Sequence, residues 1–600
     1  MIGRFFSSIF IFTLRVLTLD GLVEWHRFPR VLGMLGVIRL LAYRSMLRRQ
    51  NLYDTSAGMS KDLPDPSGDY LTARMPGGRF NDLDDPNMGS AGARFGRNFP
   101  LDRVHPESAA ELLTPSPRTV SLELMTRHTF TPATILNVLA AAWIQFMVHT
   151  WVNHGGIAPD EPIEIPLEED DPWPEKPMRI QRTPPDPTRS PSEDNLPPTF
   201  VNTVTHWWDG SQIYGSNAEE VAELRSGVDG KLPIGNDGLL PLDPTTGIDK
   251  TGFSNNYWIG LSVLHTLFTL EHNALCNMFQ AEYPSWSDDE LFNHARLVNT
   301  ALMAKIHTVE WTPAIISHPA TQYVMRASWW GILGERFHRR FGRVGRGSIL
   351  SGYPGARKDH YGVPFTLTEE FVSVYRLHPL LPDDFRFRSA SDNKFLQERD
   401  LIQVAGKNTR EVQNQISMTD IIYSLCTSHP GAMRLHNFPR TLQQFHPQGD
   451  GDLIDLAAID ILRDRERGLP RYNEFRRLIH RPPVKSFEEL TGDPALAEEI
   501  RRVYDGDIDR VDVQIGMLAE PLPRGFGFSD TAFRIFILMA GRRLTSDRFF
   551  TTDYNTRVYK KVGMNWIRDN DMTTVLRRHY PELAPSLEGV KNAFAPWPVH

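Results

Sequence analysis

The sequence contains very little cysteine: Cys276 and Cys426 are the only two among 600 residues. Both lie in apolar stretches with helical periodicity, so we interpret them as reduced core residues. This composition argues against a disulfide-stabilised framework. The sequence also shows no Rossmann or P-loop fingerprint, the glycine-rich signals of dinucleotide and nucleotide binding.

Positive charge is not in excess either. The formal net charge at pH 7 is −8. A chain with this balance lacks the overall electrostatic footprint of a nucleic-acid-binding protein, and we expect no nucleic-acid partner.

The N-terminal fifty residues lack an uninterrupted apolar run of the roughly 20 residues that span a bilayer. The segment is nevertheless strongly apolar and punctuated by arginines. We predict that residues 1–55 form amphipathic helices that lie on a membrane surface, so that the protein is intracellular and peripherally membrane-associated. A helix packed on the protein body and a cleaved signal peptide are the alternatives.

Helical periodicity dominates the rest of the chain. Hydrophobic residues make up 40% of the sequence, which is enough for a large core. Periodic segments are separated by proline-rich loops, and the acidic stretch 155–200 is predicted to be a surface insertion. We therefore expect a mainly α-helical fold with little β structure.

One predicted helix, residues 131–155, carries two polar side chains in an apolar surrounding. Thr131 and Pro132 are typical of a helix start, and Gly155 of a helix end. Gln145 and His149 are four residues apart and therefore share a face. Buried polar side chains need partners. The pair forms either the oxygen-facing side of a haem site or an ordinary hydrogen-bonded core pair.

A second predicted helix, residues 367–379, contains the sequence Tyr375-Arg-Leu-His378-Pro. Tyr375 and His378 are three residues apart and are predicted to face the same way. A neutral imidazole is the usual proximal ligand of a haem peroxidase. If His378 binds haem iron, Tyr375 lies within reach of the porphyrin edge and can carry a radical. The alternative is a core tyrosine beside a helix-terminal histidine.

These two segments together resemble the cyclooxygenase and α-dioxygenase branch of the animal-type haem peroxidase superfamily. Further stretches resemble superfamily motifs in the same order along the chain: 207–216, 264–273, 455–473 and 547–550. Others are similar to the plant-type fatty-acid α-dioxygenases: 25–29, 95–98, 143–147, 305–308 and 578–581. The similarity is collinear from about residue 25 to the C-terminus. It implies a haem peroxidase-like fold in which residues 56–600 form one catalytic domain.

The resemblance also implies an activity and its residues. Haem b would be bound by His378, with His149 and Gln145 on the distal side. A haem-generated radical on Tyr375 would abstract a hydrogen from the α-carbon of a long-chain fatty acid, and O₂ would add to give a 2-hydroperoxy acid. We expect a monomer. The positions that resemble the carboxylate anchors of the family are His307, Thr312 and Arg548.

Two departures from the superfamily pattern refine this interpretation. Ser254 and Tyr257 occupy the positions at which the mammalian peroxidases have an arginine and an ester-forming glutamate. Neither residue can do that work, which favours a dioxygenase over a multiple-turnover peroxidase. The remaining alternatives are a fatty-acid oxygenase that attacks an internal carbon, a plain haem peroxidase, and a catalytically silent membrane-surface protein.

Calcium is a second candidate cofactor. The superfamily binds it through the loop that contains Asp209, and hard oxygen donors suit this ion. The family places an aspartate directly after the distal histidine, but this chain has Thr150, which removes one carboxylate. The candidate ligands are Thr205, the carbonyl of Trp207, Asp209 and Ser211.

Overall fold

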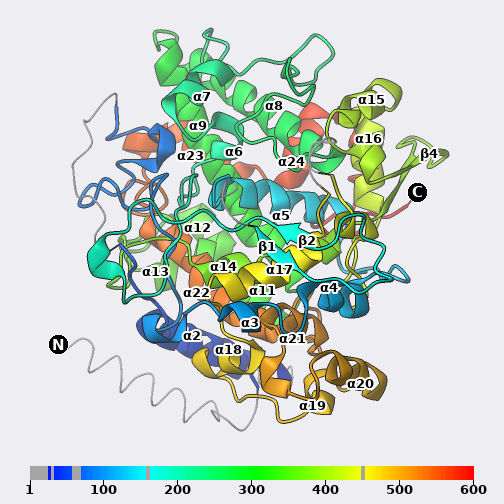
Figure 1. The fold of residues 1–600 in the computed structure, drawn as a ribbon. Helices are drawn as coiled ribbons and strands as arrows, with labels where there is room; N and C mark the ends of the chain where they lie inside the picture. Colours follow the sequence, from blue (N-terminus) through cyan, green and yellow to red (C-terminus); the bar gives the residue numbers. More distant parts are fainter. Residues whose placement is uncertain (1–23, 29–32, 57–68, 157–161, 447–452, 600) are drawn as a thin grey trace, which may run out of the picture.

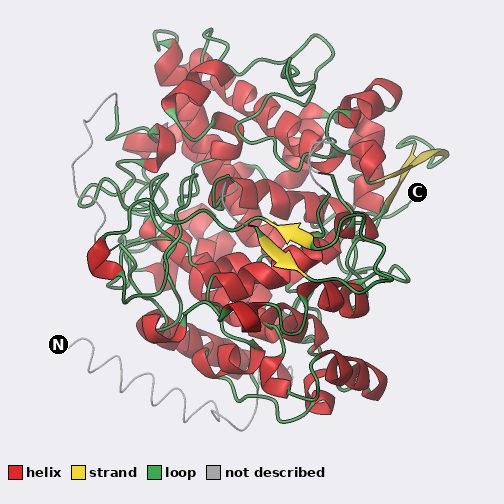
Figure 2. Cartoon of the chain, in the orientation of Figure 1, coloured by secondary structure: helices red, strands yellow, loops and turns green. Residues whose placement is uncertain are grey.

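The computed structural model describes residues 24–28, 33–56, 69–156, 162–446 and 453–599. These residues form a mainly helical body with two short strand pairs (Figures 1 and 2). The principal helices are α2 (Gly33–Gln50), α5 (Val138–Trp151), α8 (Ile259–Glu282), α9 (Asp288–Ile306), α11 (Pro319–Trp330), α12 (Gly334–Phe341), α14 (Glu369–Val374), α15 (Asn408–Gln415), α16 (Met418–Thr427), α17 (Leu456–Glu466), α18 (Tyr472–Leu478), α20 (Pro494–Val503), α21 (Val513–Ala519), α22 (Asp530–Ser546), α23 (Thr556–Asp569) and α24 (Met572–His579).

Shorter helices connect these: α3 (Ala109–Leu112), α4 (Pro117–Val120), α6 (Ser211–Tyr214), α7 (Ala218–Leu224), α10 (Thr312–Ile315), α13 (Ser348–Ser351) and α19 (Phe487–Thr491). The strands form two antiparallel pairs. β1 (Ile163–Ile165) aligns Ile163 with Ile180 of β2 (Met178–Ile180), and β3 (Asp384–Arg388) aligns Asp384 with Asp400 of β4 (Phe395–Asp400). The prediction of a mainly α fold with little β is confirmed.

The core is built around α5, which packs against α8; α8 packs in turn against α9, and α23 covers α9. Helix α5 can occupy this central place because its sequence is apolar nearly all round. A second, smaller hydrophobic cluster lies beneath β1 and β2, so part of the predicted surface insertion has its own apolar contacts.

The boundaries of two predicted helices are corrected by the structure. Helix α5 begins at Val138 rather than at residue 132, because the Asn137 side chain caps it by accepting a hydrogen bond from the Ala140 N–H. It ends at Trp151, and Gly155, with φ +83°, lies beyond it. Helix α14 ends at Val374 rather than at His378. Tyr375 is its C-cap and His378 lies in a separate 3₁₀ turn, so these two residues do not share one helix face as the sequence predicted.

The N-terminal part of the described chain is packed on the body. Helix α2 packs against α11 and α22. The Trp25 Nε1–H donates to Asp530 Oδ1 at 3.0 Å, and the Asn51 side chain donates to the Leu478 carbonyl at 2.9 Å. Within the described ranges, no helix is both long and apolar enough to cross a membrane. Residues 1–23, which carry much of the predicted membrane-associating segment, lie outside the described residues.

Candidate functional site

The middle of α5 has an open face. The helix is buried along its length except at Gln145 and Val148, which are partly exposed. The Gln145 Oε1 accepts a hydrogen bond from the Trp258 indole N–H at 2.8 Å, so the amide nitrogen turns to His149 Nε2, 3.5 Å away. Burial lowers the pKa of His149 to about 3, which keeps the imidazole neutral. The predicted Gln145–His149 pair is therefore present, with His149 Nε2 in the acceptor role.

His378 begins a short 3₁₀ turn after α14, and a carboxylate orients it. Its Nδ1 lies 2.7 Å from Asp460 Oδ2 on α17. An Nδ1–H that donates to a carboxylate leaves the Nε2 lone pair available, and a ligating histidine is usually held in this way. The His378 side chain is one-third exposed. These features fit His378 to the role of a haem ligand.

Tyr375 lies between these histidines in the sequence and is enclosed by aromatic rings. Its ring centroid lies 4.3 Å from that of Phe371 and 6.2 Å from that of Phe536, and Trp151 meets it edge-on at 6.1 Å. The phenolic oxygen is buried, and within the described part of the chain it has no hydrogen-bond partner. Burial raises the pKa of Tyr375, so the phenol stays protonated.

A narrow cavity beside Tyr375 contains two of the three predicted anchors. It lies between α2, α11 and α22, and Phe536 lines both this cavity and a smaller one that contains Tyr375. His307 and Thr312 both line it. The Trp143 N–H donates to His307 Nδ1 at 3.2 Å, which places the imidazole proton on Nε2 as a donor. Burial, and secondly Arg543, lowers the pKa of His307 well below its usual value.

The third predicted anchor, Arg548, is in the wrong place. Its guanidinium is engaged by the carbonyls of Tyr70, Leu71 and Phe80 and by the Asp553 carboxylate, which hold the loop 70–80 against the C-terminal helices. These contacts use four of its five N–H donors. Arg548 also does not line the cavity. The prediction that Arg548 anchors a substrate carboxylate is therefore corrected.

Arg543, on α22, occupies that position instead. It lines the cavity together with His307 and Thr312. Its guanidinium carbon lies 3.6 Å from the centre of the Trp151 ring, and burial lowers its pKa to about 10. Among the described residues, its three nitrogens, the His307 Nε2 and the Thr312 hydroxyl have no hydrogen-bond partner. Buried polar atoms are nearly always satisfied. Such a group of unsatisfied donors therefore indicates a ligand rich in acceptor oxygens, and a carboxylate has this character.

Sequence reasoning missed both Arg543 and Asp460. A signal existed for each, because each is a charged residue within an apolar helical pattern. Such residues are rarely buried unless they have a partner. The family-like stretch 547–550 directed attention to Arg548, five residues too far along the chain.

The predicted calcium ligands do lie together in a buried loop. The Asp209 Oδ2 and the Ser211 Oγ are both buried without a hydrogen-bond partner among the described residues. Burial raises the pKa of Asp209, and the Arg296 Nη2 lies 3.6 Å from its Oδ2. Thr205 Oγ accepts from the Trp207 N–H at 2.9 Å. Thr150, in place of an aspartate, donates a hydrogen bond to the Gln212 Oε1. Two unsatisfied oxygens fit a cation, but the site has one carboxylate and a neighbouring guanidinium.

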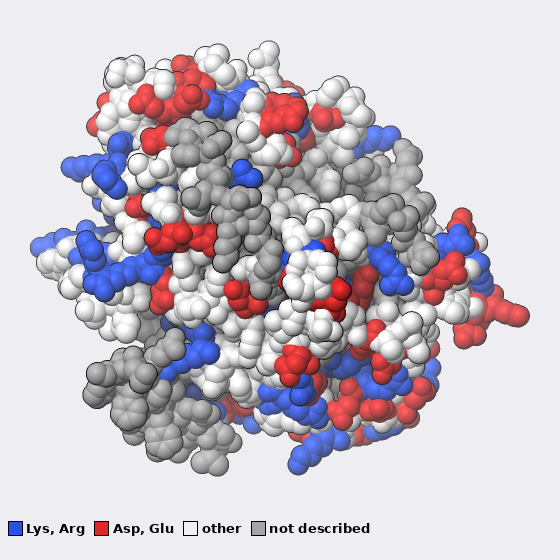
Figure 3. Space-filling model, turned by 60° about the vertical axis from the view of Figure 1, so that its left-hand side comes forward, with Lys and Arg blue, Asp and Glu red and all other residues white. Residues whose placement is uncertain are grey.

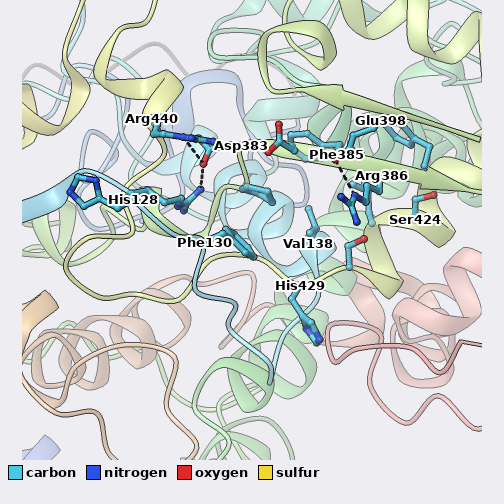
Figure 4. A pocket seen from close by; sticks show the side chains of 16 residues that line it. His128, Phe130, Val138, Asp383, Phe385, Arg386, Glu398, Ser424, His429 and Arg440 are labelled. Carbon is cyan, nitrogen blue, oxygen red and sulfur yellow. Dashed lines mark hydrogen bonds and ion pairs between the residues drawn. The ribbon is translucent and has the colours of Figure 1, made fainter. Parts of the chain in front are cut away.

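A wider cavity of about 350 Å³ lies elsewhere, between β3, α16 and the segment 127–138 (Figure 4). Its charged walls pair internally. Asp383 binds Arg127 at 2.9 Å, and Arg386 binds Glu398 at 3.0 Å. Arg127 also donates to the carbonyl of Pro379 at 2.9 Å, so this wall supports the turn that carries His378. None of the predicted site residues lines it.

Comparison with known proteins agrees with this geometry. The family model described as animal haem peroxidase matches residues 73–594. The chain is 39% identical over 589 residues to alpha-dioxygenase PIOX of Oryza sativa subsp. japonica, covering 96% of this chain and 93% of the rice protein. It is 37% identical over 594 residues to alpha-dioxygenase 1 of Arabidopsis thaliana, covering 96% and 91%.

Solved structures show the same likeness. The crystal structure of Oryza sativa fatty acid alpha-dioxygenase superposes with a TM-score of 0.90 at 36% identity, covering 99% of this chain and 97% of that one. A Tyr-to-Phe variant of the rice protein with palmitic acid superposes equally well. Peroxidase A of Dictyostelium discoideum, at 21% identity and a TM-score of 0.66, shares the fold. The chain belongs to the animal haem peroxidase family and, within it, to the alpha-dioxygenases.

Proposed function

We propose that this protein is a haem-dependent fatty-acid α-dioxygenase, which uses O₂ to convert a long-chain fatty acid into a 2-hydroperoxy acid. One observation carries the proposal: the unsatisfied donors of Arg543, His307 and Thr312 line a cavity that adjoins Tyr375. The palmitic acid in the structure of the rice relative supports the same substrate class.

Substrate position follows from where these donors lie. Arg543 is in contact with Trp151, and Trp151 is in contact with Tyr375. A carboxylate bound by Arg543, with the His307 Nε2–H and the Thr312 hydroxyl donating to it, therefore has its Cα close to Tyr375. Each charge-assisted hydrogen bond contributes roughly 1.5–3 kcal/mol. A dozen buried methylenes contribute on the order of 10 kcal/mol gross. The tail thus dominates affinity, and the anchor selects the carbon that reacts.

The haem would be held by His378, which Asp460 orients, and His149 and Gln145 would line its site. When bound and oxidised by a peroxide, it would supply the oxidising equivalent that converts the Tyr375 phenol into a phenoxyl radical. The Tyr375 oxygen then accepts a hydrogen atom from Cα of the acid. O₂ adds to the carbon radical, and the resulting peroxyl group regains a hydrogen atom from the Tyr375 O–H. The aromatic enclosure keeps water from the radical.

Two accessory features complete the proposal. The Asp209 loop binds calcium weakly, through Asp209 and Ser211 with Thr205 and the Trp207 carbonyl, because Thr150 removes a carboxylate. Residues 1–23 associate peripherally with membranes, in keeping with their apolar, arginine-containing sequence. Helix α2 contributes less to membrane binding than the sequence predicted, because its apolar side is largely used against α11 and α22.

Product analysis tests the function. The haem-loaded protein is incubated with palmitate and oleate under air while O₂ uptake is recorded, and the products are identified by mass spectrometry. We expect oxygen at C2 of both acids, together with the aldehyde one carbon shorter that follows loss of CO₂. Oxygen at an internal carbon would favour the alternative oxygenase. Peroxide-dependent oxidation of small reductants without O₂ uptake would favour a plain peroxidase.

A further inference from the structure

An exposed apolar and basic segment follows the cavity helix α11. Residues 332–350 contain five arginines and one acidic residue, Glu335, in a protein whose net charge is −8. Basic and acidic side chains are otherwise interspersed on the face seen in Figure 3. Several of the exposed large hydrophobic side chains of the described chain also lie in this segment: Ile332, Leu333, Phe341, Val344, Ile349 and Leu350.

The segment has a fixed shape. The Ile332 N–H donates to the Ile349 carbonyl at 3.0 Å, and the Tyr353 N–H donates to the Ser328 carbonyl at 2.8 Å, so its two ends are held together on α11. Inside the loop, the Arg343 guanidinium donates to the carbonyls of Gly347 and Gly352 at 2.9 and 3.0 Å. The exposed side chains therefore lie on a segment whose backbone is held in place by hydrogen bonds.

Helix α12 shows which side of this segment faces outward. His338 packs its ring against Trp330 at 5.4 Å, and Arg339 pairs with Asp569 at 3.1 Å, so this side meets the protein. Leu333, Phe337 and Phe341 follow one another at intervals of four residues and share the opposite side, where the Phe337 and Phe341 rings lie 4.9 Å apart. Phe341 is 64% exposed.

Arg336 and Arg340 flank this apolar ridge, since they also lie four residues apart on the adjoining strip of the helix. Across the described ranges, neither they nor Arg346 has a carboxylate within ion-pair distance. An apolar ridge bordered by unpaired arginines matches a bilayer surface with anionic headgroups, where the rings enter the acyl boundary and the guanidinium groups remain at the phosphates.

We infer that the segment 332–350 is a docking site for anionic membranes, carried by a helix that lines the cavity. The same helix α11 lines the cavity through Val324, Met325 and Ser328, and it carries α12 and α13 on its outer side. Docking would bring the bilayer, in which fatty acids dissolve, next to the site that binds them. This consequence for delivery rests on the proposed function, whereas membrane binding itself does not.

Vesicle sedimentation tests the inference on the full-length, haem-loaded protein. Sucrose-loaded vesicles of phosphatidylcholine with phosphatidylserine are compared with vesicles of phosphatidylcholine alone. The double variant Arg336→Glu/Arg340→Glu is expected to bind the anionic vesicles at least about tenfold more weakly, because two guanidinium groups that attract the lipid phosphates are replaced by carboxylates that repel them. Phe341→Ser/Ile349→Ser should weaken binding to both vesicle types.

The matched control is Arg179→Glu/Arg502→Glu, which makes the same charge change on β2 and α20. It should bind like wild type, and residues 1–23 are constant in every sample. Equal binding by wild type and the Arg336/Arg340 variant would overturn the inference, as would an equal loss in the control. Wild type that sediments with neither vesicle would also overturn it and would leave the segment as a protein-binding surface.

Activity separates this inference from the proposed function. The Arg336/Arg340 variant should oxidise palmitate in solution at the wild-type rate and palmitate carried in anionic vesicles more slowly. Wild type that binds vesicles but oxidises palmitate in neither form would refute the proposed function while leaving the docking site intact.

Discussion

The guanidinium of Arg543 lies against the face of Trp151, with 3.6 Å between its central carbon and the ring centre. This stacking fixes an unpaired cation one aromatic ring away from Tyr375. On the proposed function, the position of this cation determines which carbon of a bound acid lies next to the Tyr375 phenol.

Arg543 and Arg548 offer a matched pair of substitutions. Arg543→Met should raise KM for palmitate by about ten- to 150-fold, the equivalent of one charge-assisted hydrogen bond of roughly 1.5–3 kcal/mol. Stability should stay the same or rise slightly, because a buried cation without a partner is removed. Thermal melts and initial rates measure both quantities.

Arg548→Met should have the opposite pattern, with a loss of stability and no change in KM for palmitate. It leaves Asp553 and three carbonyls without their donor and should lower stability by about 2–4 kcal/mol. KM of the folded fraction should not change. A large KM effect from Arg548→Met, with none from Arg543→Met, would restore the sequence-based assignment.

Asp460 should control haem affinity through His378. Asp460→Ala removes the acceptor of the Nδ1–H, and loss of such a partner typically costs 10–100-fold in metal affinity. Haem titration followed by Soret absorbance measures the change. Asp464→Ala is the control, because Asp464 and Asp460 both pair with Arg376, at 2.7 and 3.5 Å, but Asp464 is not the partner of His378. Similar haem affinities in the two variants would contradict the orienting role.

The chemistry of the site could be predicted from the sequence more reliably than its local geometry. Gln145 and His149 could be paired because residue type and helical spacing suffice for two side chains on one helix. His307 and Thr312 could be located only through the family resemblance, and the structure places both at one cavity. The end of α14 could not be predicted from the sequence. It depends on Pro379 and on the contacts that Arg376 makes with α17, and the latter join segments far apart in the sequence. Nor could Arg543 be told from Arg548, because the difference lies in which carbonyls a distant loop presents.

Calcium binding should depend on position 150. In wild type, chelation with EDTA should lower Tm only slightly. Thr150→Asp restores a second carboxylate and should make Tm rise with calcium concentration, since a ligand stabilises the state that binds it. Thr150→Asn serves as the uncharged control. If the Tm of the Thr150→Asp protein does not change with calcium concentration, the Arg296 guanidinium alone is sufficient to neutralise the Asp209 carboxylate.

Acid should destabilise the protein through its buried neutral histidines. Burial lowers the pKa of His272 to about 4, below the value of about 6.5 in the unfolded chain. The contribution of neutral His272 to the free energy of unfolding is therefore complete above pH 6.5 and is lost as the pH falls toward 4. Between pH 8 and 4.5, His272 should account for a decrease of about 2–3 kcal/mol in that free energy. Denaturant melts at both pH values should show a smaller loss in His272→Gln, and an equal loss would exclude this histidine as the cause.

Tyr375→Phe tests the central claim most directly. The substitution keeps the ring, its contacts with Phe371, Phe536 and Trp151, and the haem ligand, but removes the phenolic O–H. Because that oxygen has no hydrogen-bond partner within the described chain, Tm should not fall. The measurement is O₂ uptake with palmitate by haem-loaded wild type and variant, together with product identification. We predict normal haem absorbance, undiminished palmitate binding and no O₂ uptake by the variant; 2-hydroperoxide formation at a rate near that of wild type would contradict the account.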